Sequence, residues 1–317
     1  SNKGRALVYE NSSGTTWTEV GNIYPALSSR FAEKLEINDD GNVLIVGAPY
    51  TNQGVAQVYE NTSGTTWSQI GNDITGSATG SPLCGYSVSV SGDGTIISVG
   101  EPSNQDNGIS GRGRVRVFER NSNSWDLRQE FYGTAQDREI GKTLSINSDG
   151  SFIAIGAEGD GDNGFFRIYK WGDDSTYQQI GEDIPGDAAG DTLAGEEMNS
   201  LSMSSDGYTV VAGAQGNDEA GSGAGRVKAF KANFVTTTTT TQVQDGTIAS
   251  EMSLKAGGTS ANPDLSISMI PGGTVYQNQT TSVTTIDTDS DYTSYGNIIG
   301  AAGAKITYGD NIGARML

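Results

Sequence analysis

The chain has 317 residues, including 45 glycines, and its 38 acidic side chains against 19 basic ones give a net charge of −19. The Lys and Arg residues are scattered, which argues against a nucleic-acid-binding protein, and no apolar run is long enough to predict a membrane span. Histidine is absent and Cys84 is the single cysteine, which excludes an intramolecular disulfide and every catalytic arrangement built on histidine. Paired carboxylates could still catalyse hydrolysis, but almost all Asp and Glu residues lie in Gly-rich segments that are typical of solvated surface loops. We therefore predict no catalytic residues and interpret the chain as a non-enzyme, with an acidic secreted hydrolase as a remote alternative.

A tandem repeat occupies most of the chain. The segment from Asn11 to Gly21 recurs, with conservative exchanges, from Asn61 to Gly71. Each unit contains a strand with Tyr or Phe, a second strand opened by an aromatic residue, an alternating strand that runs into an Asp-Gly turn, and an apolar strand that ends in glycine. A period of roughly 50 to 60 residues is typical of propellers and other repeat arrays.

These landmarks predict the strands in chain order. The Tyr/Phe strands are Leu7–Glu10, Gln57–Glu60, Arg116–Glu119, Arg167–Lys170 and Lys228–Lys231. The aromatic openers of the second strands are Trp17, Trp67, Trp125 and Tyr177. The turns are Asp40-Gly41, Asp93-Gly94, Asp149-Gly150 and Asp206-Gly207. Because period-two alternation around Asp-Gly predicts a hairpin, each unit is predicted to be a four-stranded antiparallel propeller blade, with all four turns on one rim.

The repeat resembles the FG-GAP repeat of integrin-α-type β-propellers. The residues that carry the resemblance are Gly85–Val90, Asp93-Gly94, Val99–Pro102 and Gly113–Phe118, with a closer match at Val46–Pro49 and Gly54–Tyr59. The resemblance covers residues 5 to 234 and implies a propeller of the kind found in viral or phage fibres and secreted surface proteins. Calcium-binding members of that family carry several acidic residues in the hairpin loop. Here the turns have few acidic companions, which argues against calcium in them.

The number of strands leaves the ends of the propeller open to two interpretations. There are four full repeats and a partial one, because the Tyr/Phe strand occurs a fifth time near the amino terminus. Either residues 7–21 complete the blade begun by residues 199–213 and close a five-bladed ring with one strand to spare, or further blades precede Ser1. We favour the closed ring.

Two acidic loops are candidate calcium sites, and calcium is the only cofactor we consider. The first places oxygen ligands on Asp160, Asp162 and Asn163, and the second on Asp287, Asp289 and Asp291. Alternate oxygen-bearing side chains suit a loop that wraps a hard cation. Calcium takes six or more oxygens and each loop supplies three or four, so an ordinary polar loop is the alternative.

Two residue types have competing interpretations. Aromatic residues at equivalent places in successive units predict packing between blades, and the alternative is a platform that stacks sugars. Cys84 precedes an alternating strand, so we predict a buried, unreactive thiol rather than a nucleophile.

The composition changes after Phe234, where six threonines run from Thr236 to Thr241. We therefore divide the chain into propeller repeats (1–234) and a Thr-rich connector with a small β-rich assembly or anchoring domain (235–317). Its alternating Thr-rich segments favour self-association, or docking to other structural proteins, over catalysis.

Taken together, the sequence predicts an all-β protein: a β-propeller of four-stranded antiparallel blades followed by a small β-rich domain. The predicted function is that of a structural or surface-display protein of a virion or extracellular assembly, with the propeller exposed. The alternative is an adhesin module of a cell surface that binds a glycan.

Overall fold

The computed structural model describes residues 4–25, 30–77, 80–105, 111–134, 139–159, 163–188, 190–195 and 200–232 with their side chains. Beyond these it describes the backbone of the strands between residues 234 and 307. The described residues form strands, turns and loops and contain no helix, so the predicted all-β class is confirmed. Accordingly, no described helix is long and apolar enough to cross a membrane.

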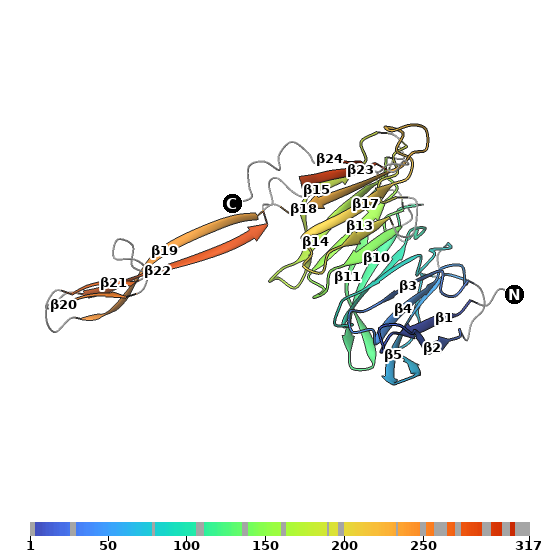
Figure 1. Ribbon diagram of the computed structural model, residues 1–317, viewed down its shortest axis with the longest axis horizontal. Helices are drawn as coiled ribbons and strands as arrows, with labels where there is room; N and C mark the ends of the chain where they lie inside the picture. Colours follow the sequence, from blue (N-terminus) through green and yellow to red (C-terminus); the bar gives the residue numbers. More distant parts are fainter. Residues whose placement is uncertain are drawn as a thin grey trace. The chain divides into compact units, whose positions relative to one another are not determined.

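Four antiparallel sheets are arranged as the blades of a β-propeller (Figure 1). Blade 1 contains β3 (Lys34–Ile37), β4 (Val43–Ala48), β5 (Val55–Ser63) and β6 (Thr66–Gln69), with β7 (Ile74–Thr75) also on β5. Blade 2 contains β8 (Ser87–Val90), β9 (Ile96–Glu101), β10 (Arg114–Asn121) and β11 (Ser124–Tyr132). Blade 3 contains β12 (Thr143–Ile146), β13 (Phe152–Ala157), β14 (Phe165–Trp171) and β15 (Tyr177–Pro185). Blade 4 contains β16 (Leu201–Met203), β17 (Thr209–Ala214) and β18 (Arg226–Lys231), extended by β23 (Thr293–Ile299) and β24 (Lys305–Thr307).

The core lies between successive blades. The second strands β4, β9 and β13 are buried along their whole length, as expected for apolar strands covered on both faces. Val88 and Val90 of blade 2 pack against Val43 and Ile45 of blade 1 in one such layer. Blade 1 thus buries apolar side chains against blade 2, and blade 2 against blade 3, as expected for a repeat array.

The glycine near the end of the second strand is explained by crowding in blades 1, 2 and 3. A Cβ atom on Gly47 would lie 2.0 Å from the carbonyl oxygen of Gly85, and one on Gly100 would lie 2.1 Å from that of Gly141. The backbone of the next blade approaches at this point, so a side chain does not fit.

The favoured ring closure is wrong. β1 (Ala6–Glu10) pairs with β2 (Thr18–Ile23) in a sheet of its own and does not join blade 4. The edge of β18 is instead taken by β23, in a register that runs from Arg226 opposite Ile299 to Lys231 opposite Thr293. The repeat pattern could not reveal this, because residues 293–299 carry none of its landmarks.

The chain divides into two compact units, residues 1–232 with 290–317 and residues 233–289. The predicted domain of residues 235–317 thus contributes strands to both units. In the second unit, β19 (Phe234–Thr247) pairs with β22 (Thr274–Ile286), and β20 (Met252–Ala256) pairs with β21 (Leu265–Met269). The threonine run pairs with residues 279–284. Both ladders are two-stranded among the described residues, so every strand in them has one edge without a ladder partner.

Candidate functional site: the propeller axis

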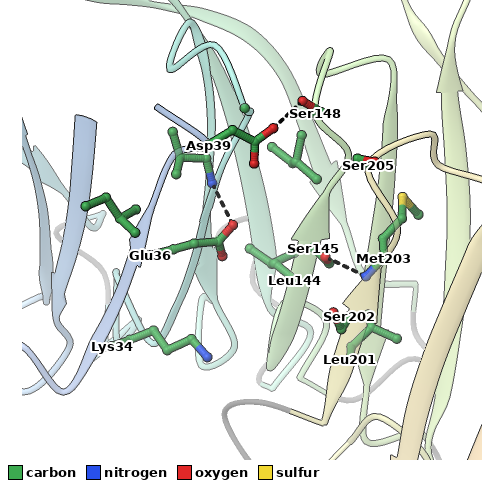
Figure 2. Close-up of a pocket in the computed structure, with 14 residues that line it drawn as sticks. Lys34, Glu36, Asp39, Leu144, Ser145, Ser148, Leu201, Ser202, Met203 and Ser205 are labelled. Atoms are coloured by element: carbon green, nitrogen blue, oxygen red, sulfur yellow. Dashed lines mark hydrogen bonds between the residues drawn. The ribbon is translucent and has the colours of Figure 1, made fainter. Parts of the chain in front are cut away.

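A pocket of about 420 Å³ lies where the first strands of the four blades converge. Figure 2 shows side chains from β3, β12 and β16 around it. Its charged lining comes from one blade, in the side chains of Lys34, Glu36 and Asp39. This pocket is the candidate site because it gathers equivalent positions of all four repeats.

Blade 1 departs from the repeat at the positions that line this pocket. Where blade 1 has Lys34, the other blades have Ser87, Thr143 and Ser200. Where blade 1 has Glu36, they have Ser89, Ser145 and Ser202, and where it has Asp39, they have Gly92, Ser148 and Ser205. Lys34, Glu36 and Asp39 were not among the site residues predicted from the sequence. Aligning the four alternating strands would have found them, because three small residues become charged in a single repeat.

The side chain of Glu36 links blade 1 to blade 2 by hydrogen bonds. Its carboxylate accepts hydrogen bonds from the Ser89 hydroxyl at 3.0 Å and from the backbone N–H of Val90 at 3.4 Å. The same joint recurs along the axis, because Ser89 accepts from the N–H of Ile146 at 2.9 Å and Ser145 accepts from that of Met203 at 3.0 Å. In each case a side-chain oxygen binds a backbone donor of the next blade.

Burial shifts the pKa values of Glu36 and Lys34 in the direction that favours the uncharged form of each side chain. It raises the pKa of Glu36 to about 7, against the hydrogen bonds from Ser89 and Val90 and the nearby charge of Lys34. It lowers the pKa of Lys34 to about 8, opposed by the charge of Glu36. Proton exchange near neutral pH therefore changes the charge of the axis without any histidine.

A second set of contacts joins the Asp-Gly turns. The N–H of Asp39 donates to the carbonyl of Gly92 at 3.2 Å, that of Gly92 to Ser148 at 2.8 Å, and that of Ser148 to Ser205 at 3.0 Å. The Ser148 hydroxyl also donates to the Asp39 carboxylate at 2.6 Å, which links the turns of blades 1 and 3 (Figure 2). The prediction that all four turns share one rim is confirmed.

The turn aspartates of blades 2, 3 and 4 accept hydrogen bonds within their own turns. Asp93 accepts from the Ser91 hydroxyl and from Thr95, and Asp206 accepts from the Ser204 hydroxyl and the N–H of Tyr208. Although burial opposes the shift for Asp93, these donors hold the pKa of both carboxyls below its usual range. The turn carboxylates thus serve as turn-stabilising acceptors.

The candidate calcium ligands fall almost entirely outside the described residues. Asp160, Asp162, Asp287, Asp289 and Asp291 lie there. Asn163 is described, and its backbone carbonyl accepts a hydrogen bond from the N–H of Leu193 at 2.9 Å. Among the described residues, no three His, Cys, Asp or Glu side chains lie close enough to hold a metal ion. Both calcium loops stay predictions.

The repeated aromatic residues mostly pack between blades. The indole N–H of Trp67 donates to the Val20 carbonyl of the preceding sheet at 3.1 Å, and that of Trp125 donates to Ile70 at 3.2 Å. Tyr177, the equivalent residue of blade 3, is buried. Trp17, which directly precedes β2, is 66% exposed, and no described blade lies before the β1–β2 sheet. The packing interpretation is confirmed for the complete blades.

Cys84 is fully buried, and its thiol lies 3.2 Å from the carbonyl oxygen of Ile74. Burial raises the pKa of the thiol to about 12, so little thiolate forms at neutral pH. The predicted burial of the thiol is confirmed, and its raised pKa agrees with the predicted lack of reactivity.

No family model and no curated protein matches the chain, so the FG-GAP resemblance is supported only at the level of a β-propeller. Similar solved structures include a functionally unknown protein from Desulfotomaculum acetoxidans (15% identity, TM-score 0.46, covering 72% of this chain and 58% of that one). A putative 6-phosphogluconolactonase from Bacteroides fragilis has 11% identity and a TM-score of 0.44, covering 72% of this chain and 61% of that one. A putative TolB from Agrobacterium tumefaciens has 8% identity and a TM-score of 0.45, covering 92% and 99%. The chain thus spans about three fifths of the length of the first two proteins.

Proposed function

We propose that the chain is a non-enzymatic structural protein of a virion surface or extracellular assembly, which displays the propeller and holds copies together through residues 235–317. The observation that supports this most is the ladder of β19 and β22. Its strands are 14 and 13 residues long, and each has one edge without a partner among the described residues. Two-stranded ribbons are marginal alone in water, and long free edges pair readily with other chains.

The hydrogen bonds between blades at the propeller axis support a structural role. The carboxylates of Glu36 and Asp39 already accept hydrogen bonds from other blades, so their described contacts fasten the blades together. The glycan-binding alternative has less support, because the rings of Trp67 and Trp125 are used between blades.

Sedimentation of the full chain over a range of concentrations tests the proposal, with Thr238→Pro and Thr239→Pro as variants. Neighbouring residues of an antiparallel strand point their N–H groups alternately to the partner strand and outward. One of the two prolines therefore removes an outward donor and leaves the internal ladder intact. We expect oligomers of the unchanged chain at micromolar concentration and their dissociation in that variant, with an unchanged propeller melting temperature. A chain that stays monomeric, or oligomers that both variants retain, would refute the proposed role.

A further inference from the structure

We infer that blade 1, together with the edge of β1 that has no ladder partner among the described residues, forms a docking surface for a partner β-hairpin of the same repeat type. The hairpin would supply the inner two strands of the blade whose outer two strands are β1 and β2. This inference concerns the propeller and goes beyond the proposed role of residues 235–317.

The first argument is the pairing of β1. In the complete blades the equivalent Tyr/Phe strands β5, β10 and β14 are paired on both edges, with the glycine-ending strand on one side and the aromatic-opened strand on the other. β1 pairs only with β2 among the described residues. Its second edge is therefore the place where a glycine-ending strand belongs.

The second argument is burial at equivalent positions. Leu35 and Ile37 of β3 are 46% and 41% exposed. Their counterparts in blades 2 and 3 are at most 6% exposed; they are Val88, Val90, Leu144 and Ile146. These counterparts pack on the inner hairpin of the preceding blade, as Val88 and Val90 do on β4. Blade 1 has the same apolar face, and the described residues contain no hairpin in front of it.

The third argument is continuity with an existing interface. The outer half of the same face of blade 1 is already covered, because Ala6 and Ile23 of the β1–β2 sheet pack with Leu44 and Val46. The indole of Trp67 ties the two sheets together through the Val20 carbonyl. The interface between blades is thus half formed, and it stops where the inner strands of the preceding blade are required.

The repeated contacts specify the occupant. Because the N–H groups of Val90, Ile146 and Met203 each donate to a side-chain oxygen of the preceding blade, the hairpin needs Ser or Glu at the position that faces Ile37. Every second residue along the hairpin must also be aliphatic, so that these side chains cover Leu35. No second copy offers such a hairpin from its described residues, because the inner strands of each blade are already paired within it.

A synthetic hairpin with the sequence of residues 143–157, cyclised through its ends and fluorescently labelled, is a suitable probe. Fluorescence anisotropy would be measured as the full chain is added. We expect saturable binding that Leu35→Lys weakens by more than about tenfold, because docking would bury an unpaired charge. Leu127→Lys is the matched control, since Leu127 is 53% exposed on the outer strand β11, and it should leave binding unchanged.

Both positions are exposed, so both variants should fold, which circular dichroism verifies. Absence of binding at millimolar hairpin, or equal binding by the two lysine variants, would overturn the inference. Sedimentation of both variants tests whether a second copy of the chain, instead of a hairpin, occupies this face. If Leu35→Lys alone dissociates an oligomer of the full chain, the face binds a second copy and the hairpin assignment is wrong.

Discussion

Blades 1 and 3 carry the same strands in the same order, yet their first strands have different surroundings. Leu144 and Ile146 of β12 are buried against blade 2, whereas Leu35 and Ile37 of β3 are exposed. The difference shows that period-two alternation determines which face of a strand is apolar, while the neighbouring blade determines whether that face is buried. Blade 1 differs further in carrying charged residues where blade 3 has Thr143, Ser145 and Ser148.

Alanine at the equivalent leucines tests this comparison with the largest expected effect. Leu144→Ala should lower the free energy of unfolding by about 2 to 5 kcal/mol, because it leaves a cavity between blades. Leu35→Ala should cost less than about 1 kcal/mol, because the side chain is half exposed. Urea denaturation of the two variants measures both values. Equal losses would mean that Leu35 is covered in solution.

The pH dependence of stability tests the charged axis. The pKa of Glu36 is raised by burial to about 7, so the folded state holds its proton more tightly than the unfolded chain does. This contribution to stability is present below about pH 4.5 and is lost as pH rises through 7, by at most about 3 kcal/mol. Glu36→Gln should flatten the profile in that window. Lys34, whose pKa is lowered to about 8, acts in a separate window between about 8 and 10.5 and in the opposite direction.

Ser145→Ala is the control for this prediction, since Ser145 forms the equivalent hydrogen bond between blades 3 and 4 but carries no charge. Its unfolding profile between pH 4.5 and 7 should parallel that of the unchanged chain. A Glu36→Gln profile that retains the full decline would contradict the raised pKa.

Alanine substitutions compare a glycine that is crowded by the backbone of the next blade with a glycine that is not. Gly100→Ala should cost about 1 to 3 kcal/mol, because its Cβ would meet the Gly141 carbonyl oxygen of the next blade. At Gly213 of blade 4 the nearest atom would lie 3.4 Å away, so Gly213→Ala should change stability by less than about 1 kcal/mol. Thermal unfolding of the two variants distinguishes them. Similar costs would argue that blade 4 is covered by another blade.

The smallest effect is expected at the tryptophans. Trp125→Phe removes the hydrogen bond to Ile70 and should cost about 0.5 to 1.5 kcal/mol. Trp17→Phe should be nearly neutral, because its ring is largely exposed. The difference between the two unfolding midpoints checks this, and a larger loss at Trp17 would show that its ring is covered.

Much of the propeller could be predicted from the sequence. The Asp-Gly turns and the glycine-ending strands identified the hairpins, because those turns need the conformational freedom of glycine and those strands approach the next backbone closely. The pairing of β18 with β23 could not be foreseen, since a strand without repeat landmarks gives no sign of its partner. The charged axis was missed for another reason. Lys34, Glu36 and Asp39 are conspicuous only when the repeats are compared position by position.

The strands β19 and β22 also have one edge each without a partner among the described residues. Hydrogen bonding at these edges in solution tests the proposed assembly role most directly. Hydrogen exchange of the Thr236–Thr241 amides should be measured in the full chain at low and high concentration. In a lone ribbon the alternate amides that point outward exchange quickly. The account predicts that, at the higher concentration, these amides become protected like their inward-pointing neighbours. Outward amides that exchange quickly at every concentration would contradict it.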